Sequence, residues 1–554
     1  MANSDIKKMI IIGVDGATFD VIDPYIEQGE FNGFQKISEN GSRSPLCSSI
    51  PPVTGPSWVS FMTGKNPGKH GIFDFVKPAK GEIKRRPVTF KHIKSKTIWH
   101  LVSEQRKKVG VINMPLTYPP PEINGFFITG LLTPSGASDI TYPAELMDEV
   151  KKNAGPYTLD VWWQYYGEKG VEKFFDDMLE CTRQRIKVMD YLMDNKEWDL
   201  FMPVFIGSDR IQHYLWQYIH PADPANLTKR EQFFTEKIKE YFLLVDGYIN
   251  KIIDRWENDA NIIVISDHGF GPLTKKMYIN RWLEENQYLF LQKNRHTHLF
   301  LKKWIMKLKR FLRQYDKLNL RKYILPFARR GGRASAYDFL NVIDWTQTRA
   351  YSASNTEQGI YLNLQGREPD GIVAQGEEYK KLRSEIIEEL RKLKDPETGE
   401  PVISHIYTKE ELYNGPLTDN APDIIFFVKE GEYLADVQLK DRIFEDANWT
   451  SGWGTHRLHG ILMGYGPDIR KKGNVQNAHI MDLAPTILRL MNIPVPSDMD
   501  GKILEGMIEE DFLRKHPTQY SGECKIKDDS QADNVLSDED TQEIEKRLKG
   551  LGYI

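Results

Sequence analysis

Three stretches of the chain share one pattern, a continuous apolar run that leads into an aspartate beside glycine or serine. They are Met9–Gly16, Leu200–Asp209 and Asn261–Gly269. Runs without polar alternation are typical of strands buried on both faces of a sheet. Helical patterns lie between them, at Val171–Asn195 and Lys237–Trp256. This order predicts an α/β fold with a mostly parallel central sheet flanked by helices.

The alternation of strands and helices stops after Gly271. Residues 295–333 carry thirteen lysines and arginines against one acidic residue, Asp316, with apolar residues at helical spacing. This pattern predicts a basic amphipathic helix in an inserted cap or lid. A solvated lid helix is the favoured interpretation, a contact with a membrane surface or an anionic ligand is the alternative, and nucleic acid is the least favoured partner.

The pattern divides the chain into four parts. We predict a catalytic core in two pieces, residues 1–272 and 401–505. An inserted cap is expected at 273–400 and a C-terminal extension at 506–554. The central sheet is expected to resume at Asp423–Val428 and Gly460–Gly466. A polar, acidic segment from Gly522 leads to a closing helix at Glu543–Leu548, which predicts a flexible linker with a docking end.

The composition of the chain is that of an ordinary globular protein. The chain has 554 residues, of which 40% are hydrophobic and 27% charged, and its net charge of -4 gives no overall attraction to nucleic acid or membrane. The three cysteines, Cys47, Cys181 and Cys524, are far apart and lack metal-ligand spacing, which favours a reducing, cytoplasmic location. The apolar run near the start is too short for a signal peptide or a membrane span. Oligomeric state is not predicted.

Acidic residues follow each of the three predicted strands. Any one aspartate at such a position can simply cap the next helix. Since the carboxyl ends of parallel strands meet at one edge of a sheet, where ligands collect, we expect Asp15, Asp209 and Asp267 to lie together.

Histidines accompany these aspartates. His213 follows Asp209 at i+4, on the same helix face, His268 follows Asp267 directly, and His456 lies in a glycine-rich turn before an apolar strand. Three carboxylates and three imidazoles are ligands that divalent metals prefer, with zinc first and manganese as an alternative. Six ligands would crowd one ion. Divided between two ions, they would leave each ion an open coordination position.

Thr54 stands between two prolines and the pair Gly55-Pro56. We predict that Thr54 caps a helix that has Pro56 just inside its start. A plain cap would account for the residue, but a metal beside the hydroxyl would lower its pKa, and the helix end would receive a phosphate oxygen. Thr54 is then a nucleophile, and Gly55 lets the backbone approach the anion.

The segment TGPSWVSFMTGKNPGKHGI, which contains Thr54 and His70, resembles the nucleophile segment of the type I phosphodiesterase/nucleotide pyrophosphatase branch of the alkaline phosphatase superfamily. The resemblance extends to IIIGVDG, to D-x-x-x-H at Asp209, to the S-D-H-G turn, to G-T-H before an apolar strand, and to DLAPTIL with MDG at Asp482–Gly501. These segments run from residue 9 to about 504 and leave out the basic insertion.

The resemblance implies an alkaline-phosphatase-like fold, two divalent metal ions, a phospho-threonine intermediate and a small-molecule phosphate ester or anhydride as substrate. The ion that activates the nucleophile would be held by Asp15, Thr54, Asp267 and His268. The ion that stabilises the leaving group or activates the water would be held by Asp209, His213 and His456.

One position departs from the family pattern. Nucleotide-cleaving relatives place an asparagine that contacts the phosphoryl group where this chain has Phe75. A donor must come from elsewhere, and we assign the Gly55 amide to this contact. Cys47 does not supply the C-x-P-x-R sequence of sulfatases, and Thr54 favours hydrolysis over the chemistry of phosphoglycerate mutases, which use serine.

Three functions compete. The first is a metal-dependent hydrolase of phosphodiester or nucleotide pyrophosphate bonds, the second a phosphomonoesterase or phosphonate-type hydrolase on the same site, and the third a non-catalytic phosphate- or lipid-binding scaffold. His70 is expected to fix its turn and His459 to be an ordinary satisfied residue. The aromatic group Trp162, Trp163, Tyr165 and Tyr166 favours core packing over a ligand pocket.

Overall fold

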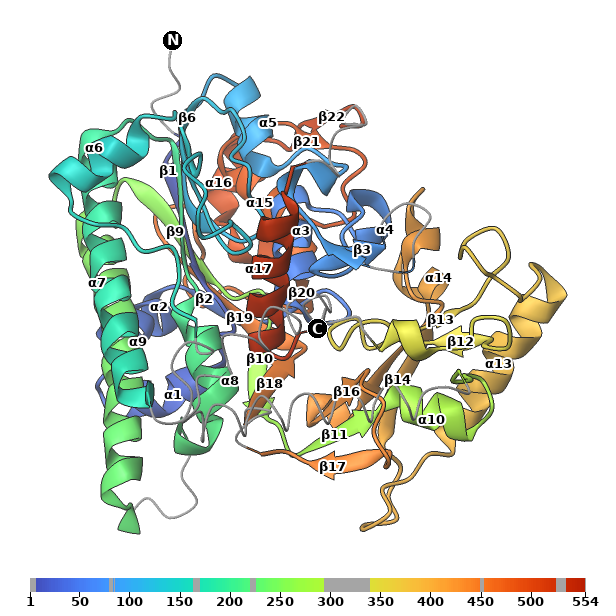
Figure 1. The fold of residues 1–554 in the computed structure, drawn as a ribbon. Helices are drawn as coiled ribbons and strands as arrows, with labels where there is room; N and C mark the ends of the chain where they lie inside the picture. The colour runs from blue at the N-terminus through green and yellow to red at the C-terminus, as the bar shows by residue number, and fades with distance from the viewer. Residues whose placement is uncertain are drawn as a thin grey trace.

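A large central sheet organises the protein, seen here in a computed structural model that describes residues 6–78, 83, 85–162, 170–219, 226–292, 339–448, 453–524 and 535–553. Within these residues its strands follow the order β20 (Ala478–His479), β2 (Ser42–Cys47), β19 (His459–Tyr465), β9 (Ala260–Ile265), β1 (Lys8–Val14), β8 (Leu200–Phe205), β5 (Val109–Met114), β6 (Gly125–Thr129) and β7 (Thr141–Tyr142). Neighbours are parallel except where β19 pairs with β2 and β9, and β7 with β6. The predicted α/β class is confirmed (Figure 1).

The three apolar runs form neighbouring strands at the middle of this sheet. β1 pairs in parallel with β8 on one side and β9 on the other. Every residue of β8 and β9 is buried, as are all of β1 after Lys8. Burial on both faces explains why these strands lack polar alternation, and their parallel direction brings their carboxyl ends to one edge.

Helices cover both faces of the sheet. They are α1 (Phe19–Glu27), α2 (Asn32–Asn40), α3 (Thr54–Thr63), α4 (Pro67–His70), α5 (Ile98–Glu104), α6 (Leu146–Asn153), α7 (Val171–Asn195), α8 (Gly207–Ile219), α9 (Lys229–Trp256), α15 (Leu483–Leu490), α16 (Glu510–Lys515) and α17 (Asp538–Gly550). In Figure 1, α2, α7 and α9 lie to the left of the sheet and α3, α5 and α15 to its right. α7 has the predicted bounds, but α9 begins at Lys229 rather than Lys237, because Thr228 and Glu231 form a capping box there.

A second lobe follows the short strand β10 (Gly269–Pro272), which pairs with β18 (Gly454–Arg457). Its elements are β11 (Lys275–Tyr278), α10 (Ile279–Glu285), β12 (Ala350–Tyr351), β13 (Gly359–Leu362), α13 (Glu377–Arg391), β14 (Ile403–Thr408), α14 (Lys409–Leu412), β15 (Ile424–Val428), β16 (Tyr433–Asp436) and β17 (Phe444–Asp446). The prediction that the central sheet resumes at Asp423–Val428 is wrong, because β15 pairs antiparallel with β13 and β14. The expected boundary at residue 400 falls between α13 and β14.

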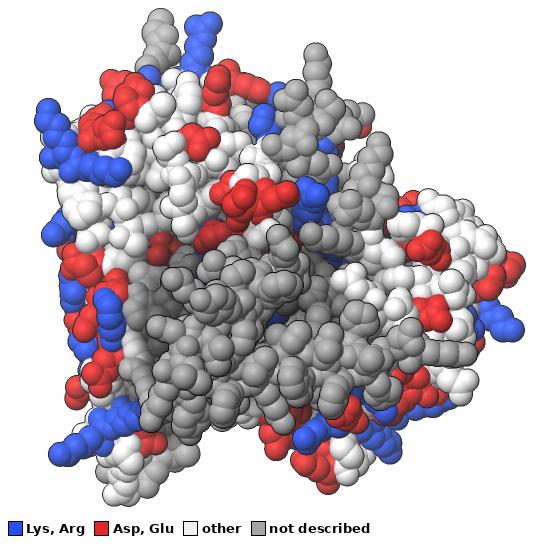
Figure 2. Space-filling view, viewed as in Figure 1, with Lys and Arg blue, Asp and Glu red and all other residues white. Residues whose placement is uncertain are grey.

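Four short strands lie outside these sheets: β3 (Val76–Pro78), β4 (Arg85–Pro87), β21 (Val495–Pro496) and β22 (Tyr520–Ser521). Basic and acidic side chains intermingle along the left edge of Figure 2. Between α7 and α9, Arg183 pairs with Glu240 and Lys251 with Asp190. None of the helices in the described ranges is long and apolar enough to span a membrane. The predicted basic helix at 295–333 lies outside the described residues.

Candidate metal centre and nucleophile

Three aspartates meet at the carboxyl edge of the central strands. Asp15 directly follows β1, Asp267 follows β9, and Asp209 lies in the first turn of α8, just after β8. All three are fully buried. Together with three histidines they form two groups of candidate ligands. Within each group the ligand atoms lie within 4.8 Å of one another.

The first group consists of Asp15, Asp267 and His268, with Thr54 beside it. The Nε2 atom of His268 lies 3.3 Å from Asp267 Oδ2 and 3.7 Å from Asp15 Oδ1. The Thr54 hydroxyl lies 3.1 Å from the same nitrogen. The structure therefore brings together the four residues that the sequence assigns to the ion at the nucleophile.

One oxygen of each aspartate in this group is already held by the protein. Trp58 donates its indole N–H to Asp15 Oδ2 at 3.1 Å, and the Gly16 amide donates to Asp267 Oδ1 at 3.1 Å. Gly16 has a φ of 68°, a left-handed conformation that glycine adopts without strain. The other oxygens, Asp15 Oδ1 and Asp267 Oδ2, are buried and have no hydrogen-bond partner among the described residues. Two unpartnered carboxylate oxygens beside an imidazole nitrogen fit a divalent cation.

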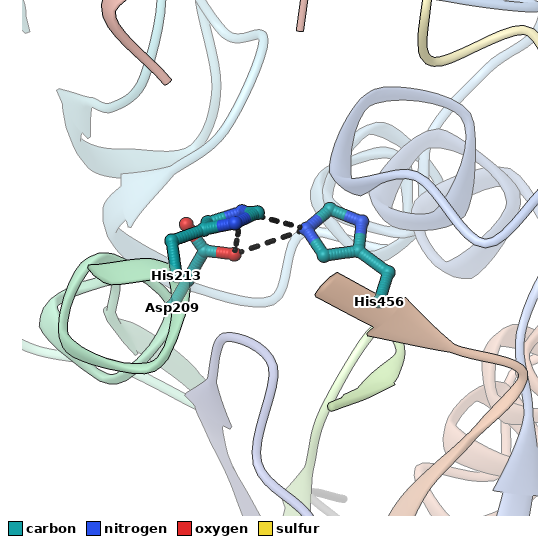
Figure 3. A group of neighbouring side chains, drawn as sticks. All are labelled: Asp209, His213 and His456. Carbon is teal, nitrogen blue, oxygen red and sulfur yellow. Dashed lines mark hydrogen bonds and ion pairs between the residues drawn. The ribbon is translucent and has the colours of Figure 1, made fainter. Parts of the chain in front are cut away.

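The second group consists of Asp209, His213 and His456, shown in Figure 3. Asp209 Oδ1 lies 3.4 Å from His213 Nε2 and 3.2 Å from His456 Nε2. The two Nε2 atoms are 3.0 Å apart. His213 comes from α8, one helical turn after Asp209, and His456 comes from β18 on the opposite side of the group, as the figure shows.

Backbone carbonyls fix the orientation of all three imidazoles. The Nδ1 atoms of His213, His268 and His456 lie 3.2, 3.0 and 2.9 Å from the carbonyl oxygens of Gly454, Gly269 and Pro52. A carbonyl can only accept, so Nδ1 carries the proton and Nε2 keeps its lone pair. Hydrogen bonds of this kind are typical of metal-binding histidines, because they aim the free nitrogen at the ion.

The two groups lie side by side. The rings of His268 and His456 stack with their centroids 3.6 Å apart. Burial raises the pKa of Asp15 well above its ordinary value, with Asp267 and Asp209 adding to the shift. Burial also raises the pKa of Asp267, to about 8. Cations beside these acids would restore their charge, because opposite charge favours the ionised carboxylate.

Asp209 differs from the other two acids. Burial works to raise its pKa, but the groups around the carboxylate, with the charge of Arg210 among them, bring the pKa well below the ordinary value. Arg210 is fully buried and lies 2.5 Å from Asp209 Oδ2 and 3.0 Å from Asp160 Oδ2. It leaves Oδ1 of Asp209 to face the histidines, which is the orientation that a metal ligand needs.

Thr54 is the first residue of α3, and Val53 occupies the N-cap position. The predicted cap is therefore one residue too late, and the Thr54 hydroxyl points to His268 instead of capping the helix. Ser57, in the first turn, bonds to Ser48 and Ser49 at 2.7 Å each, and this holds the proline-rich loop on the helix. A Cβ added at Gly55 would meet Phe75 at 3.4 Å. The role of Gly55 in phosphate binding remains a prediction.

The structure also places other residues that the sequence analysis names, namely two histidines and an aromatic group. Ser60 Oγ and the Ile72 amide bond to the two ring nitrogens of the buried His70, at 3.0 and 3.2 Å, which fixes the turn after α4. His459 is exposed on β19. Trp162 is buried beneath Arg210, with the guanidinium 4.7 Å from the ring. The other aromatic residues of that group, Trp163, Tyr165 and Tyr166, lie outside the described residues.

Sequence reasoning missed several residues that contact the two groups, among them Trp58, Arg210 and Tyr553. Trp58 and Arg210 hold Asp15 and Asp209, and Tyr553, at the far end of the chain, reaches the second group. The position of Arg210 directly after Asp209 was the available signal, because a charge beside an aspartate in an apolar segment needs a partner. Trp58 sits in an ordinary apolar helix pattern, and Tyr553 has no motif around it.

A family model described as type I phosphodiesterase / nucleotide pyrophosphatase matches residues 9–460 of the chain. The match covers all the candidate ligands and Thr54, and it confirms the resemblance seen in the sequence.

Two solved structures share the fold. A murine ectonucleotide pyrophosphatase/phosphodiesterase 5, an inactive threonine-to-alanine variant in complex with AMP, is 14% identical with a TM-score of 0.51. That comparison covers 91% of this chain and 100% of the other. The phosphonoacetate hydrolase of Sinorhizobium meliloti 1021 in complex with phosphonoacetate is 16% identical with a TM-score of 0.52, over 88% of this chain and 95% of the other.

A curated relative matches only a part. GPI ethanolamine phosphate transferase 3 from Eremothecium gossypii is 28% identical over 134 residues, which is 24% of this chain and 11% of the relative. The chain thus spans about a tenth of that relative's length.

Proposed function

Because the chain belongs to the type I phosphodiesterase/nucleotide pyrophosphatase family, we propose that it is a metal-dependent hydrolase of phosphodiester or nucleotide pyrophosphate bonds that uses Thr54 as its nucleophile. The family and the structural neighbours support a phosphoester hydrolase or transferase. The observation that carries the finer proposal is the Thr54 hydroxyl, 3.1 Å from His268 Nε2 and beside two unpartnered carboxylate oxygens.

The residues of the chain have separate tasks in this reaction. Asp15, Asp267 and His268 would hold one cation and Asp209, His213 and His456 the other, zinc first and manganese as the alternative. The bound cations would lower the pKa of the Thr54 hydroxyl and offset the charge of the phosphate. The Thr54 oxygen then bonds to phosphorus as the ester bond to the leaving group breaks, and water hydrolyses the phospho-threonine.

The start of α3 contributes to anion binding. Thr54 and Gly55 are the first two residues of this helix, and their amides belong to the set that has no acceptor within a helix. Partial positive charge gathers at such an end, which favours a phosphate oxygen there. Because Thr54 is the first residue of α3, this charge would lie beside the proposed nucleophile.

The neighbours add support of two kinds. In the murine pyrophosphatase the inactive variant replaces a threonine by alanine and holds AMP, a nucleotide phosphoester. The phosphonoacetate hydrolase holds a phosphonate. We therefore keep phosphonates and monoesters in the experiment as competing substrates.

Purified protein loaded with zinc or manganese should be assayed on nucleotide diesters, pyrophosphates, monoesters, phosphonates and glycerophosphodiesters. We expect the fastest turnover on a diester or a pyrophosphate, and a loss of about 10,000-fold or more in Thr54→Ala. Thr54→Ser keeps a hydroxyl and should keep measurable turnover. Thr63→Ala, in the same buried helix with its hydroxyl bonded to the Val59 carbonyl, is the matched control.

Two results would contradict the proposal. Unchanged turnover in Thr54→Ala would exclude the nucleophile. Binding of phosphoesters without turnover by the wild-type protein, loaded with either metal, would instead favour the non-catalytic scaffold.

A further inference from the structure

The tail helix α17 lies across the front of the molecule, and the chain after it runs into the space between the core and the second lobe (Figure 1). α17 is capped by Ser537 and Asp540, and its apolar residues Ile544 and Leu548 are fully buried. The buried guanidinium of Arg547 donates to the Thr133 carbonyl at 2.8 Å and lies 4.9 Å from the ring of Trp162. The predicted docking end is therefore packed on its own chain.

Residues after the helix are held from both sides. On the core side, Tyr214 donates its hydroxyl to the Gly550 carbonyl. On the side of the second lobe, Asn355 donates to the Gly552 carbonyl at 3.0 Å, and Ser354 lies 3.3 Å from the Tyr553 carbonyl. These bonds fix the backbone on either side of Tyr553, so the direction of its side chain is well defined.

The side chain of Tyr553 enters the second candidate metal group. Its ring stacks on Phe75, with centroids 4.9 Å apart and planes 7° from parallel. Its hydroxyl lies 3.2 Å from His213 Nε2, 3.5 Å from His456 Nε2, 3.4 Å from Asp209 Oδ1 and 3.3 Å from Asp209 Oδ2. The side chain is 3% exposed, so water does not separate these groups.

The four atoms form a nearly regular tetrahedron. The three edges among Asp209 Oδ1, His213 Nε2 and His456 Nε2 are 3.0 to 3.4 Å, and the three edges to the Tyr553 hydroxyl are 3.2 to 3.5 Å. The centre of a regular tetrahedron with such edges lies about 2 Å from each corner, which is the distance at which zinc binds nitrogen and oxygen ligands. A hydroxyl that served only as a hydrogen-bond donor to Asp209 would not need similar distances to both histidine nitrogens.

We propose that Tyr553 is the fourth protein ligand of the cation held by Asp209, His213 and His456, and that the tail thereby occupies the position that a substrate phosphate oxygen must take. This inference rests on the proposed function, since it assumes a cation in that group. Catalytic zinc sites keep one position open, whereas sites with four protein ligands are closed. The docked tail therefore holds the enzyme in a closed state, and a substrate must displace the phenol.

The test uses the full chain loaded with Co²⁺, whose visible absorption reports the number and kind of ligands. Tyr553→Phe removes one oxygen and keeps the ring on Phe75. We expect it to weaken Co²⁺ binding at one of the two sites by about tenfold or more and to change the absorption of that site. His456→Ala identifies which band belongs to the second group, and Tyr520→Phe, at a tyrosine that is 69% exposed, is the matched control.

A second measurement uses inorganic phosphate as the probe. In the wild-type protein phosphate must displace the phenol, so Tyr553→Phe should bind phosphate several-fold more tightly and turn over a small phosphoester faster.

Failure of this inference is distinct from failure of the proposed function. Equal Co²⁺ affinity and identical spectra in the wild type and Tyr553→Phe would overturn the ligand role of Tyr553 and leave the metal site intact. Lower turnover in Tyr553→Phe with an unchanged spectrum would make the hydroxyl a donor to the substrate, which also overturns the proposal. Absence of Co²⁺ binding in the wild type would overturn both.

Discussion

The Nε2 atoms of His213 and His456 face each other at 3.0 Å, although both rings direct their Nδ1–H groups at backbone carbonyls. Two lone pairs at this distance repel unless a cation lies between them. We therefore expect a chelator to lower the melting temperature and added zinc to restore it, since a ligand that binds only the folded state stabilises by about 2.7 kcal/mol at 100 times its Kd.

The neighbouring histidines of β18 and β19 offer a matched pair for this experiment. His456→Ala removes a ligand and should lose most of the zinc-dependent rise in melting temperature, as measured by differential scanning fluorimetry. His459→Ala changes an exposed histidine three residues away and should keep the rise. Equal responses of the two variants to zinc would show that the ion binds elsewhere.

Trp58 connects the sheet to the nucleophile helix. Its ring lies on Gly13, where an added Cβ would come within 2.6 Å of it, and its N–H holds Asp15 Oδ2. Trp58→Phe leaves a second buried oxygen of Asp15 without a partner, which costs about 1–3 kcal/mol. Metal affinity should fall by about 10- to 100-fold, because the ligand is no longer oriented.

Trp99 provides the control for this variant. It is as deeply buried as Trp58, but its indole nitrogen has no acceptor among the described residues. Trp99→Phe should leave the metal affinity, measured by zinc titration, at the wild-type value. If both variants lose affinity equally, the effect comes from packing and not from the bond to Asp15.

Much of the fold could be predicted from the sequence because burial on both faces leaves a visible pattern. β1, β8 and β9 are continuous apolar runs, and the aspartates that follow them had to meet at one edge. β15 has the same kind of run, IIFFV, and its pattern predicts a strand of the central sheet, but it lies in a separate sheet with β13 and β14. Burial determines the composition of a strand, but it does not determine which strand pairs with it.

Tyr553 could not be found in this way. It reaches Asp209 across more than half of the chain, and its position depends on how α17 packs and on bonds to Gly550 and Gly552 from two lobes. Nothing local in GLGYI indicates a ligand. The ligands near strand ends were predictable because the sheet places them, whereas Tyr553 is placed by tertiary contacts alone.

Arg210 lies between two acids in the interior, Asp209 and Asp160. Arg210→Met leaves both carboxylates buried without their cation, and breaking a buried pair in this way costs about 3–5 kcal/mol. We expect a large drop in the midpoint of urea unfolding. Arg183→Met, at a half-exposed pair with Glu240, should cost about 1 kcal/mol or less. Similar midpoints for the two variants would contradict this ranking.

Asp74 is a buried acid outside the two metal groups, and it lies directly before Phe75. Its Oδ1 accepts from the Phe75 amide at 2.7 Å and from the Thr356 hydroxyl at 2.5 Å. Burial, with the charge of Glu357, raises its pKa to about 7. In the unfolded chain an aspartate releases its proton near pH 4. Between these values the folded state binds more protons, so stability falls as the pH rises from about 4 to about 7.

The variant Asp74→Asn tests the direction of this pH dependence of stability. Asparagine resembles the protonated acid and keeps an oxygen for the Phe75 and Thr356 donors, but it does not titrate. The melting temperature of the variant should therefore exceed that of the wild type more at pH 8 than at pH 5, with an upper bound of about 4 kcal/mol on the difference in unfolding free energy. Asp254→Asn, at an exposed position, should follow the wild type at both values. A constant gap between Asp74→Asn and the wild type would mean that Asp74 keeps its charge in the folded protein.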